Sequence, residues 1–172
     1  MTTFSDAGAV RLADRDYFDF VLAAAETACR RILAAVFLQD VRPSRDVRGQ
    51  VLELTMALAN RRRLGVDVRV LLTGHLSTPD IAVANLASGQ LFEAYDVPHR
   101  RSFDISPDGR RGLHSKLVIC DDVAVVGSQN WTDDAFAVNV EDAVAVTGPP
   151  VDHLAVEFDR LWSYGRGMPN AS

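Results

Sequence analysis

The stretch Leu113–Thr132, LHSKLVICDDVAVVGSQNWT, holds the most informative polar residues of the chain. Two short apolar runs, separated by Asp121 and Asp122, predict a pair of strands joined by a tight turn. Side chains two apart in a strand share a face, so His114 and Lys116 are expected to point the same way. The stretch therefore predicts a hairpin that presents an imidazole beside an ammonium group.

The second run ends on two further polar residues, Ser128 and Asn130, which share a face by the same count. An imidazole, a fixed cation and two neutral hydrogen-bonding groups together suit a phosphoryl group. We expect Asn130 to lie opposite His114 and Ser128 opposite Lys116. This pairing requires a connection with an odd number of residues, such as Asp121–Val123.

Lys116 is the only lysine in a chain that contains seventeen arginines. Arginine is thus the usual cation of this protein, and a lysine two residues after His114 suggests that a guanidinium would not serve there. A compact ammonium approaches a phosphate oxygen as a point charge, whereas arginine brings a wide planar fork. The composition supports a specific role for Lys116.

The bulk properties indicate an ordinary soluble protein. The chain has 172 residues, 48% hydrophobic and 24% charged, with a formal net charge of −5. That charge argues against a protein that coats nucleic acid generally, although a local basic groove remains compatible with it. Cys29 and Cys120 form no metal-ligand spacing and are expected to be buried thiols. An acidic N-terminus without a secretory pattern, and no apolar run of about 20 residues, predict a cytoplasmic protein without a membrane span.

Alternating helical and strand patterns run through the rest of the chain. Apolar spacing predicts helices over residues 14–31, from Ser44 or Asp46 to Arg63, from Thr78 to Ala87, and over 149–164. Apolar or alternating runs predict strands over residues 31–38, 66–72, 91–97 and 139–147. Val47 is expected on the buried face of the second helix, and Gly65 and Gly89 are expected to end the second and third. This order predicts an α/β fold in a single domain over residues 1–172, with its core at about 14–164 and short flexible termini.

A turn-rich segment, residues 98–112, leads directly into His114. It carries four arginines: Arg100, Arg101, Arg110 and Arg111. A solvated charged face explains such a cluster as well as binding does. Its position beside the candidate site favours contacts with a phosphate backbone, which makes these arginines candidate substrate-binding residues.

The spacing within the central stretch resembles a known signature. His114-Ser-Lys116, four residues, Asp121, and then Gly127-Ser128-Gln-Asn130 is similar to the HKD motif of the phospholipase D superfamily, and most similar to its small, single-motif bacterial nucleases. The resemblance implies a phospholipase D-like sandwich, a mixed β-sheet flanked by helices. This chain has five residues between Asp121 and Gly127 where the family usually has six.

The resemblance also implies catalytic roles. His114 would attack phosphorus and form a phosphohistidine, while Glu141 would accept a hydrogen bond from its other ring nitrogen. Lys116 and Asn130, helped by Ser128, would stabilise charge on the phosphate oxygens. Asp121 completes the motif and is counted with the catalytic residues on that resemblance. No metal and no other cofactor are expected.

One copy of the motif is half of such a site. A second histidine is needed to protonate the leaving oxygen and then activate water. His75, His99 and His153 lack the following lysine and Gly-Ser pair. We therefore expect a homodimer with a composite active site across a two-fold axis.

The sequence also contains features that suit other kinds of site. A metal site is one alternative, because the segment is rich in carboxylates: Asp121, Asp122, Asp133, Asp134 and Glu141. A cationic lysine beside the central histidine argues against a metal ion there, since like charges repel. Trp131 and Phe136 are expected in the core and not in base stacking. The sequence predicts a metal-independent phosphodiesterase, foremost a nuclease acting on nucleic acid. The alternatives are a phospholipase D-type lipid hydrolase or transphosphatidylase, which should show an exposed apolar patch near its site, and a non-catalytic nucleic-acid-binding module.

Overall fold

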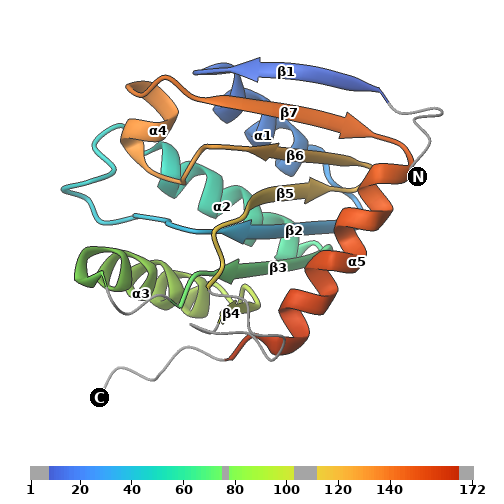
Figure 1. Ribbon diagram of the computed structural model, residues 1–172. Helices are drawn as coiled ribbons and strands as arrows, with labels where there is room; N and C mark the ends of the chain where they lie inside the picture. The colour runs from blue at the N-terminus through green and yellow to red at the C-terminus, as the bar shows by residue number, and fades with distance from the viewer. Residues whose placement is uncertain (1–7, 75–77, 103–111, 167–172) are drawn as a thin grey trace.

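The computed structural model describes residues 8–74, 78–102 and 112–166. Strands and helices alternate from β1 to β4 and again from β6 to α5, as can be followed in Figure 1. The strands are β1 (Ala9–Ala13), β2 (Arg31–Val36), β3 (Asp67–Leu72), β4 (His99–Arg101), β5 (Lys116–Cys120), β6 (Val123–Gly127) and β7 (Asp142–Thr147). The helices are α1 (Asp16–Thr27), α2 (Gln50–Arg63), α3 (Pro79–Ala94), α4 (Asp133–Ala137) and α5 (Pro149–Tyr164).

All the strands form one seven-stranded sheet in the order β1-β7-β6-β5-β2-β3-β4. The pairs β2–β3 and β3–β4 are parallel, and the remaining pairs are antiparallel. The parallel half arises from helical crossovers through α2 and α3. In the antiparallel half, β5 and β6 form a hairpin, α4 connects β6 to β7, and β1 and β2 pair with strands far along the chain. The protein is thus an α/β sandwich around a mixed sheet, as the sequence predicts.

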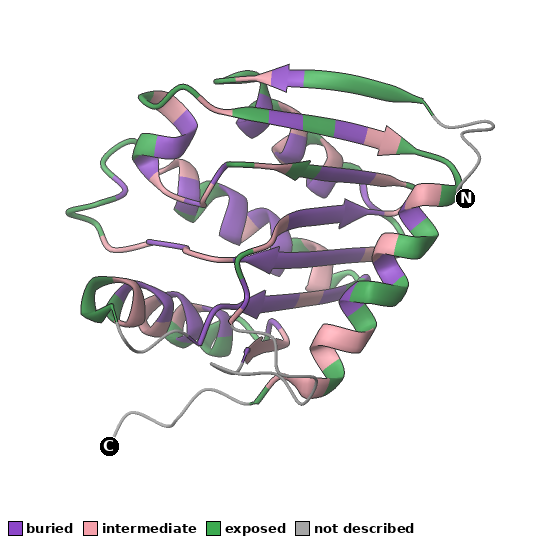
Figure 2. Cartoon of the chain, viewed as in Figure 1, coloured by how far each residue is buried: buried purple, intermediate pink, exposed green. Residues whose placement is uncertain are grey.

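The two faces of the sheet bury different cores. On one face, α1 and α2 pack Phe18 and Leu54 against Val118 and other strand residues. On the other, α5 lays Phe158 and its apolar neighbours over the central strands. Alternate residues of a strand point to opposite faces, which is why the central strands are apolar throughout. Figure 2 shows β2, β3 and β5 largely buried, in contrast to β1 and β7.

The β5–β6 hairpin differs from the predicted one. Cys120 pairs directly with Val123, so the connection is the two-residue turn Asp121-Asp122 and not an odd-length one. Asp121 adopts φ +51°, a left-handed conformation that aspartate tolerates better than most residues. The register pairs Leu117 with Val126, and β6 ends at Gly127. The predicted pairing of Ser128 with Lys116 and of Asn130 with His114 is therefore wrong.

The third helix was predicted too short. Helix α3 continues through Gly89 to Ala94, so the strand expected over residues 91–97 is wrong. Gly89 does not end the helix but lies on its buried face with Asn85, Ser88 and Phe92. The strand that follows is the short β4, within the segment predicted to be a turn-rich loop.

The start of the second helix also differs, because α2 begins at Gln50. Val47 precedes it and is 77% exposed, which contradicts its predicted place on the buried face. Asp46 does serve the helix start, since its carboxylate accepts hydrogen bonds from the backbone N–H groups of Val51 and Leu52 at 3.1 and 2.8 Å. The closing helix was predicted correctly as residues 149–164.

Candidate active site

His114 and Lys116 lie where β5 begins, at the edge of the sheet where β2 ends. Lys116 pairs with Val36, the last residue of β2. Its ammonium donates a hydrogen bond to the carbonyl oxygen of His114 at 3.3 Å. The His114 side chain is exposed at this edge and can meet a substrate from solvent.

Phe37 is the residue that brings these two side chains together. The ring of Phe37 lies 4.5 Å from the imidazole of His114, centroid to centroid. The ammonium nitrogen of Lys116 lies 5.0 Å from the centroid of the same ring, within cation–π range. The expectation that His114 and Lys116 point the same way is therefore confirmed.

The backbone around Phe37 is held by a buried polar side chain. Asn85 of α3 donates to the carbonyl oxygen of Phe37 at 3.0 Å and accepts from the N–H of Gln39 at 2.9 Å. Asn85 is 2% exposed, so these hydrogen bonds form away from water, where leaving them unmade would be costly. Helix α3 thus fixes the segment that supports His114.

Ser128 and Glu141 meet beside this edge, one after β6 and the other before β7. The Ser128 hydroxyl donates a short hydrogen bond to the Glu141 carboxylate. The other carboxylate oxygen accepts from the side-chain amide of Asn139 at 3.2 Å. Asp14 holds the Glu141 backbone through two hydrogen bonds, of 3.0 and 3.1 Å. The carboxylate is therefore held in place from both sides.

Gly127 explains how these strands approach so closely. A side chain at this position would lie 2.5 Å from the Cβ of Ala143 and 2.8 Å from the carbonyl oxygen of Asp142, both in β7. Only glycine permits that approach. The close approach of the strands allows the N–H of Ser128 to bond the carbonyl oxygen of Asp142 at 3.0 Å.

Lys116 and Glu141 interact electrostatically across the site. Partial burial lowers the pKa of Lys116, and the nearby negative charge of Glu141 opposes that shift without cancelling it. Among the described residues, no hydrogen bond joins Glu141 to the ring of His114. The orienting role of Glu141 stays a prediction.

Asn130 follows Ser128 outside the strand, so the expected two-residue alternation does not apply to it. Its side-chain oxygen is buried without a hydrogen-bond partner in the described structure. The next residue, Trp131, is 1% exposed and donates to the Tyr17 hydroxyl at 3.2 Å. Phe136 packs its ring near Tyr17 and Phe18. The prediction that both aromatic residues belong to the core is confirmed.

The structure does not bring Asp121 to this group. The residue directly follows the far end of β5, roughly 16 Å along the strand direction from Lys116 at about 3.3 Å per residue. Its carboxylate accepts hydrogen bonds from the backbone N–H groups of Cys29, Arg30 and Arg31 at 2.8, 2.8 and 3.0 Å. Partial desolvation raises the pKa of Asp121, but these bonds and the charge of Arg30 together hold it below its ordinary value. The position assigns Asp121 to the hairpin turn, not to the catalytic group.

Two of the four candidate substrate-binding arginines are described, and the side chain of one of them, Arg100, is engaged in packing. Arg100 donates to the carbonyl oxygen of Trp162 at 2.8 Å and lies 4.7 Å from that ring. Arg101 forms a two-way backbone bridge with Arg166. Arg110 and Arg111 lie outside the described residues.

The other two histidines that the structure describes do not join the group. His99 lies in β4, with its ring 5.8 Å from that of Phe92. His153 is exposed on α5, and His75 falls outside the described residues. Of the side chains that the structure places, no three histidines, cysteines or acidic residues cluster as metal ligands would. No helix within the described ranges is long and apolar enough to cross a bilayer.

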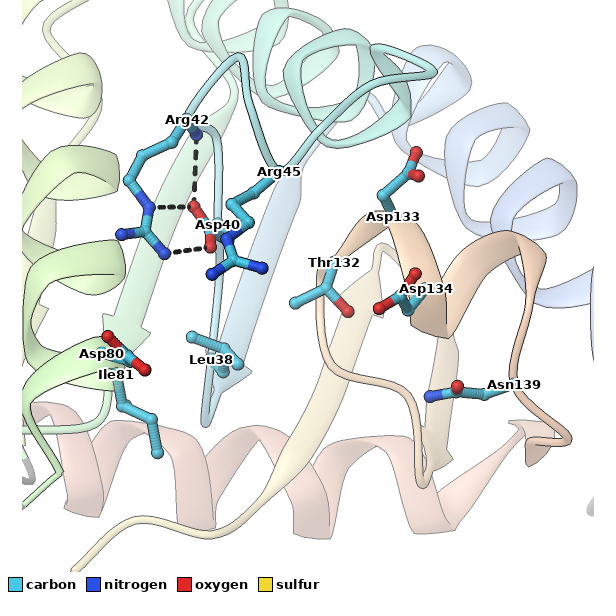
Figure 3. A pocket seen from close by; sticks show the side chains of 10 residues that line it. All are labelled: Leu38, Asp40, Arg42, Arg45, Asp80, Ile81, Thr132, Asp133, Asp134 and Asn139. Carbon is cyan, nitrogen blue, oxygen red and sulfur yellow. Dashed lines mark hydrogen bonds and ion pairs between the residues drawn. The ribbon is translucent and has the colours of Figure 1, made fainter.

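A cavity of about 310 Å³ opens next to the candidate site. It is bounded by the loop after β2 (Leu38, Asp40, Arg42, Arg45), the start of α3 (Asp80, Ile81) and the α4 segment (Thr132, Asp133, Asp134, Asn139). Figure 3 shows the α3 residues facing the α4 residues across the space, with Arg42 and Arg45 above it. Asn139 belongs both to this cavity and, through Glu141, to the group around Lys116.

Sequence reasoning missed Phe37, Asn139 and Asp14. Phe37 looks like one more apolar residue at the end of a buried run, and Asp14 sits in the left-handed conformation with φ +48° before α1. Asn139 precedes Glu141 by two residues, which was the one local signal available. Their contacts depend on segments far apart in the chain.

The chain is similar to several known proteins. Residues 25–162 match the family model described as cardiolipin synthase, PLD-like domain. A search of curated protein sequences gave no match. Among solved structures, Nuc from Salmonella typhimurium, a phospholipase D family member, superimposes with a TM-score of 0.74 at 19% identity, over 96% of this chain and 100% of that one.

Two further structures share the fold. NucT from Helicobacter pylori has a TM-score of 0.68 at 12% identity, covering 95% of this chain and 100% of its own. Phosphatidylserine synthase from Haemophilus influenzae has a TM-score of 0.71 at 11% identity, covering 96% of this chain and 40% of its own. Because the family model spans most of the chain, the protein belongs to the phospholipase D superfamily.

Proposed function

We propose that this protein is a metal-independent nuclease that hydrolyses phosphodiester bonds of nucleic acid through a phosphohistidine intermediate. The observation that carries the proposal is the convergence of His114 and Lys116 on Phe37, next to the Ser128–Glu141 pair. A nucleophile, a cation and neutral donors at one exposed edge suit an attack on phosphorus. The resemblance of the motif to the single-motif nucleases of the superfamily favours nucleic acid, and the fold is shared with Nuc along the full length of that protein.

The chemistry has two steps. A ring nitrogen of His114 bonds to phosphorus as the bond to the leaving oxygen breaks, and Lys116 stabilises charge on the non-bridging oxygens with help from Ser128 and Asn130. A second histidine donates a proton to the leaving oxygen. That histidine then takes a proton from water, which attacks phosphorus and releases His114. Glu141 would orient His114 after exchanging its present partners.

The second histidine is proposed to come from a second copy of the chain. Of the other described histidines, His99 packs on Phe92 and His153 lies on α5, so neither joins His114. A two-fold dimer would place one His114 opposite another and complete the site. Exposed apolar residues beside the site, Val138 at 60% and Val140 at 92%, provide a surface for such contact.

The same valines support a second candidate, a phospholipid phosphodiesterase. A lipid substrate calls for exposed apolar surface near the reacting group, and Val138 and Val140 flank Asn139 directly. Phosphatidylserine synthase of Haemophilus influenzae shares the fold. Substrate comparison separates this candidate from the nuclease.

The test incubates the purified protein with DNA, RNA, phospholipid vesicles and a phosphodiester reporter in the presence of chelator. We expect cleavage of nucleic acid, and a loss of roughly 10³-fold or more in His114→Ala, as for removal of a nucleophile. His153→Ala, on the exposed face of α5, is the matched control and should retain activity. Full activity of His114→Ala would exclude His114 as the nucleophile. Reversible inactivation by chelator would exclude the metal-independent mechanism, and turnover of vesicles alone would favour the lipid candidate.

A further inference from the structure

The cavity beside the candidate site is placed to hold the part of a substrate next to the reacting phosphate. Leu38 lines it and directly follows Phe37, whose ring contacts His114. On the opposite wall, Asn139 donates to Glu141 at 3.2 Å. The cavity therefore adjoins the site at two places, through Leu38 next to Phe37 and through Asn139 bonded to Glu141.

Some of the charged groups in the cavity wall are already engaged. Arg42 donates to both oxygens of Asp40 at 2.7 and 2.6 Å. Asp133 accepts from the backbone N–H of Arg48 at 3.1 Å and forms an ion pair with its guanidinium.

Three charged groups remain without such partners. The side chains of Arg45, Asp80 and Asp134 make no hydrogen bond and no ion pair with any described residue. Figure 3 shows Asp80 and Asp134 on facing walls, with Arg45 between them. A ligand could therefore meet one strong donor and two strong acceptors.

The charge and size of the cavity restrict that ligand. Four aspartates against two arginines line the space, so a second phosphate would be repelled there. The volume of about 310 Å³ lies at the low end of small-molecule pockets, enough for one ring system. An uncharged heterocycle with acceptors on one edge and N–H donors on another fits these groups.

Building on the nuclease function proposed above, we propose that this cavity binds the nucleobase next to the reacting phosphate and prefers guanine. Arg45 would donate to O6 and N7, the pair of acceptors that arginine recognises on guanine. Asp80 or Asp134 would accept from the ring N–H and the exocyclic amino group. Thymine lacks the amino group and should fit worst.

The experiment compares kcat/KM for 4-nitrophenyl esters of the four nucleoside 5′-monophosphates, for bis(4-nitrophenyl) phosphate, which has no base, and for 4-nitrophenyl phosphorylcholine. We expect the guanosine ester to exceed the thymidine ester by about tenfold, the order of one good base contact. In Asp134→Ala and Arg45→Ala, the ratio of kcat/KM for the guanosine ester to that for the thymidine ester should fall toward one. Asp19→Ala, an exposed aspartate of α1, is the matched control and should keep the wild-type ratio.

The outcomes separate the two proposals. Turnover of the base-free reporter with equal kcat/KM for all four bases would overturn the cavity assignment and leave the phosphodiesterase function standing. Preference for the phosphorylcholine reporter would overturn it in favour of an ammonium headgroup. Failure on every reporter would overturn the proposed function, and the base-binding assignment with it.

Discussion

Phe37 does more than fill space at the end of β2. Its ring contacts the imidazole of His114 and the ammonium of Lys116 at once, while Asn85 holds its backbone. An exposed imidazole without such a support would sample several rotamers, and a nucleophile displaced by about 1 Å can lose roughly 10²-fold in rate. Phe37 is a positioning residue in the proposed reaction.

Substituting Phe37 tests that role. Phe37→Leu keeps an apolar side chain but removes the ring, and we expect kcat to fall by about tenfold with KM nearly unchanged. Phe37→Tyr should restore kcat because the ring is retained. The control is Phe92→Leu, which removes a ring from a phenylalanine–histidine contact outside the site. A fall in kcat that Phe37→Tyr does not rescue would contradict the positioning role.

The residues of the candidate site differ in how well the sequence alone predicts them. His114 and Lys116 could be predicted because their two-residue spacing is local and survives folding. The role of Phe37 could not be predicted, because nothing near it in the chain shows that β2 would end beside β5. Asp121 was grouped with the catalytic residues by motif alone, and only the strand geometry separates it from them.

At the level of elements, Asp121 joins the β5–β6 hairpin to the start of β2. Its carboxylate accepts three backbone N–H groups that would otherwise lack partners at this turn. The folded-state pKa of Asp121 lies below the ordinary carboxyl value of about 4. The stability it provides is therefore present above that value and is lost as the pH falls through the lower, folded pKa.

Asp121→Asn isolates this effect, since asparagine also tolerates the left-handed backbone. We expect the free energy of unfolding to fall by about 1–2 kcal/mol at pH 7, the scale of hydrogen bonds to a charged group. The difference from wild type should shrink below about pH 4, as measured by urea unfolding. Asp122→Asn, which removes an exposed ion pair with Arg30, should change little. A deficit that is equal at pH 7 and pH 3 would argue against the carboxylate.

Elements with strong local patterns were predictable, and elements defined by distant partners were not. Helix α5 followed from its proline start and apolar face, and its bounds agree with the prediction. Strand β1 was missed because five mostly exposed residues give little signal until β7 pairs with them. The end of α3 was placed too early because Gly89 looked like a stop, whereas tertiary packing retains it inside the helix.

For the whole molecule, the proposed reaction needs a second histidine beside His114, and neither His99 nor His153 lies there. The exposed edge of the sheet carries His114, and Val138 and Val140 lie beside Glu141 with most of their surface in solvent. Isolated exposed valines are common, but these two adjoin the place where a second histidine is required. A two-fold contact that covers these valines would bury apolar surface and would also bring in the second histidine.

Val140→Asp places a charge at the centre of that contact. We expect the variant to sediment as a monomer and to lose activity in parallel, because each site would then lack its second histidine. Val156→Asp, at a 69% exposed position of α5, is the matched control and should remain dimeric and active. Sedimentation velocity and turnover measured on the same samples give the answer. An active monomer, either in the wild type or in Val140→Asp, would show that one copy of the motif suffices and would remove the composite site from the mechanism.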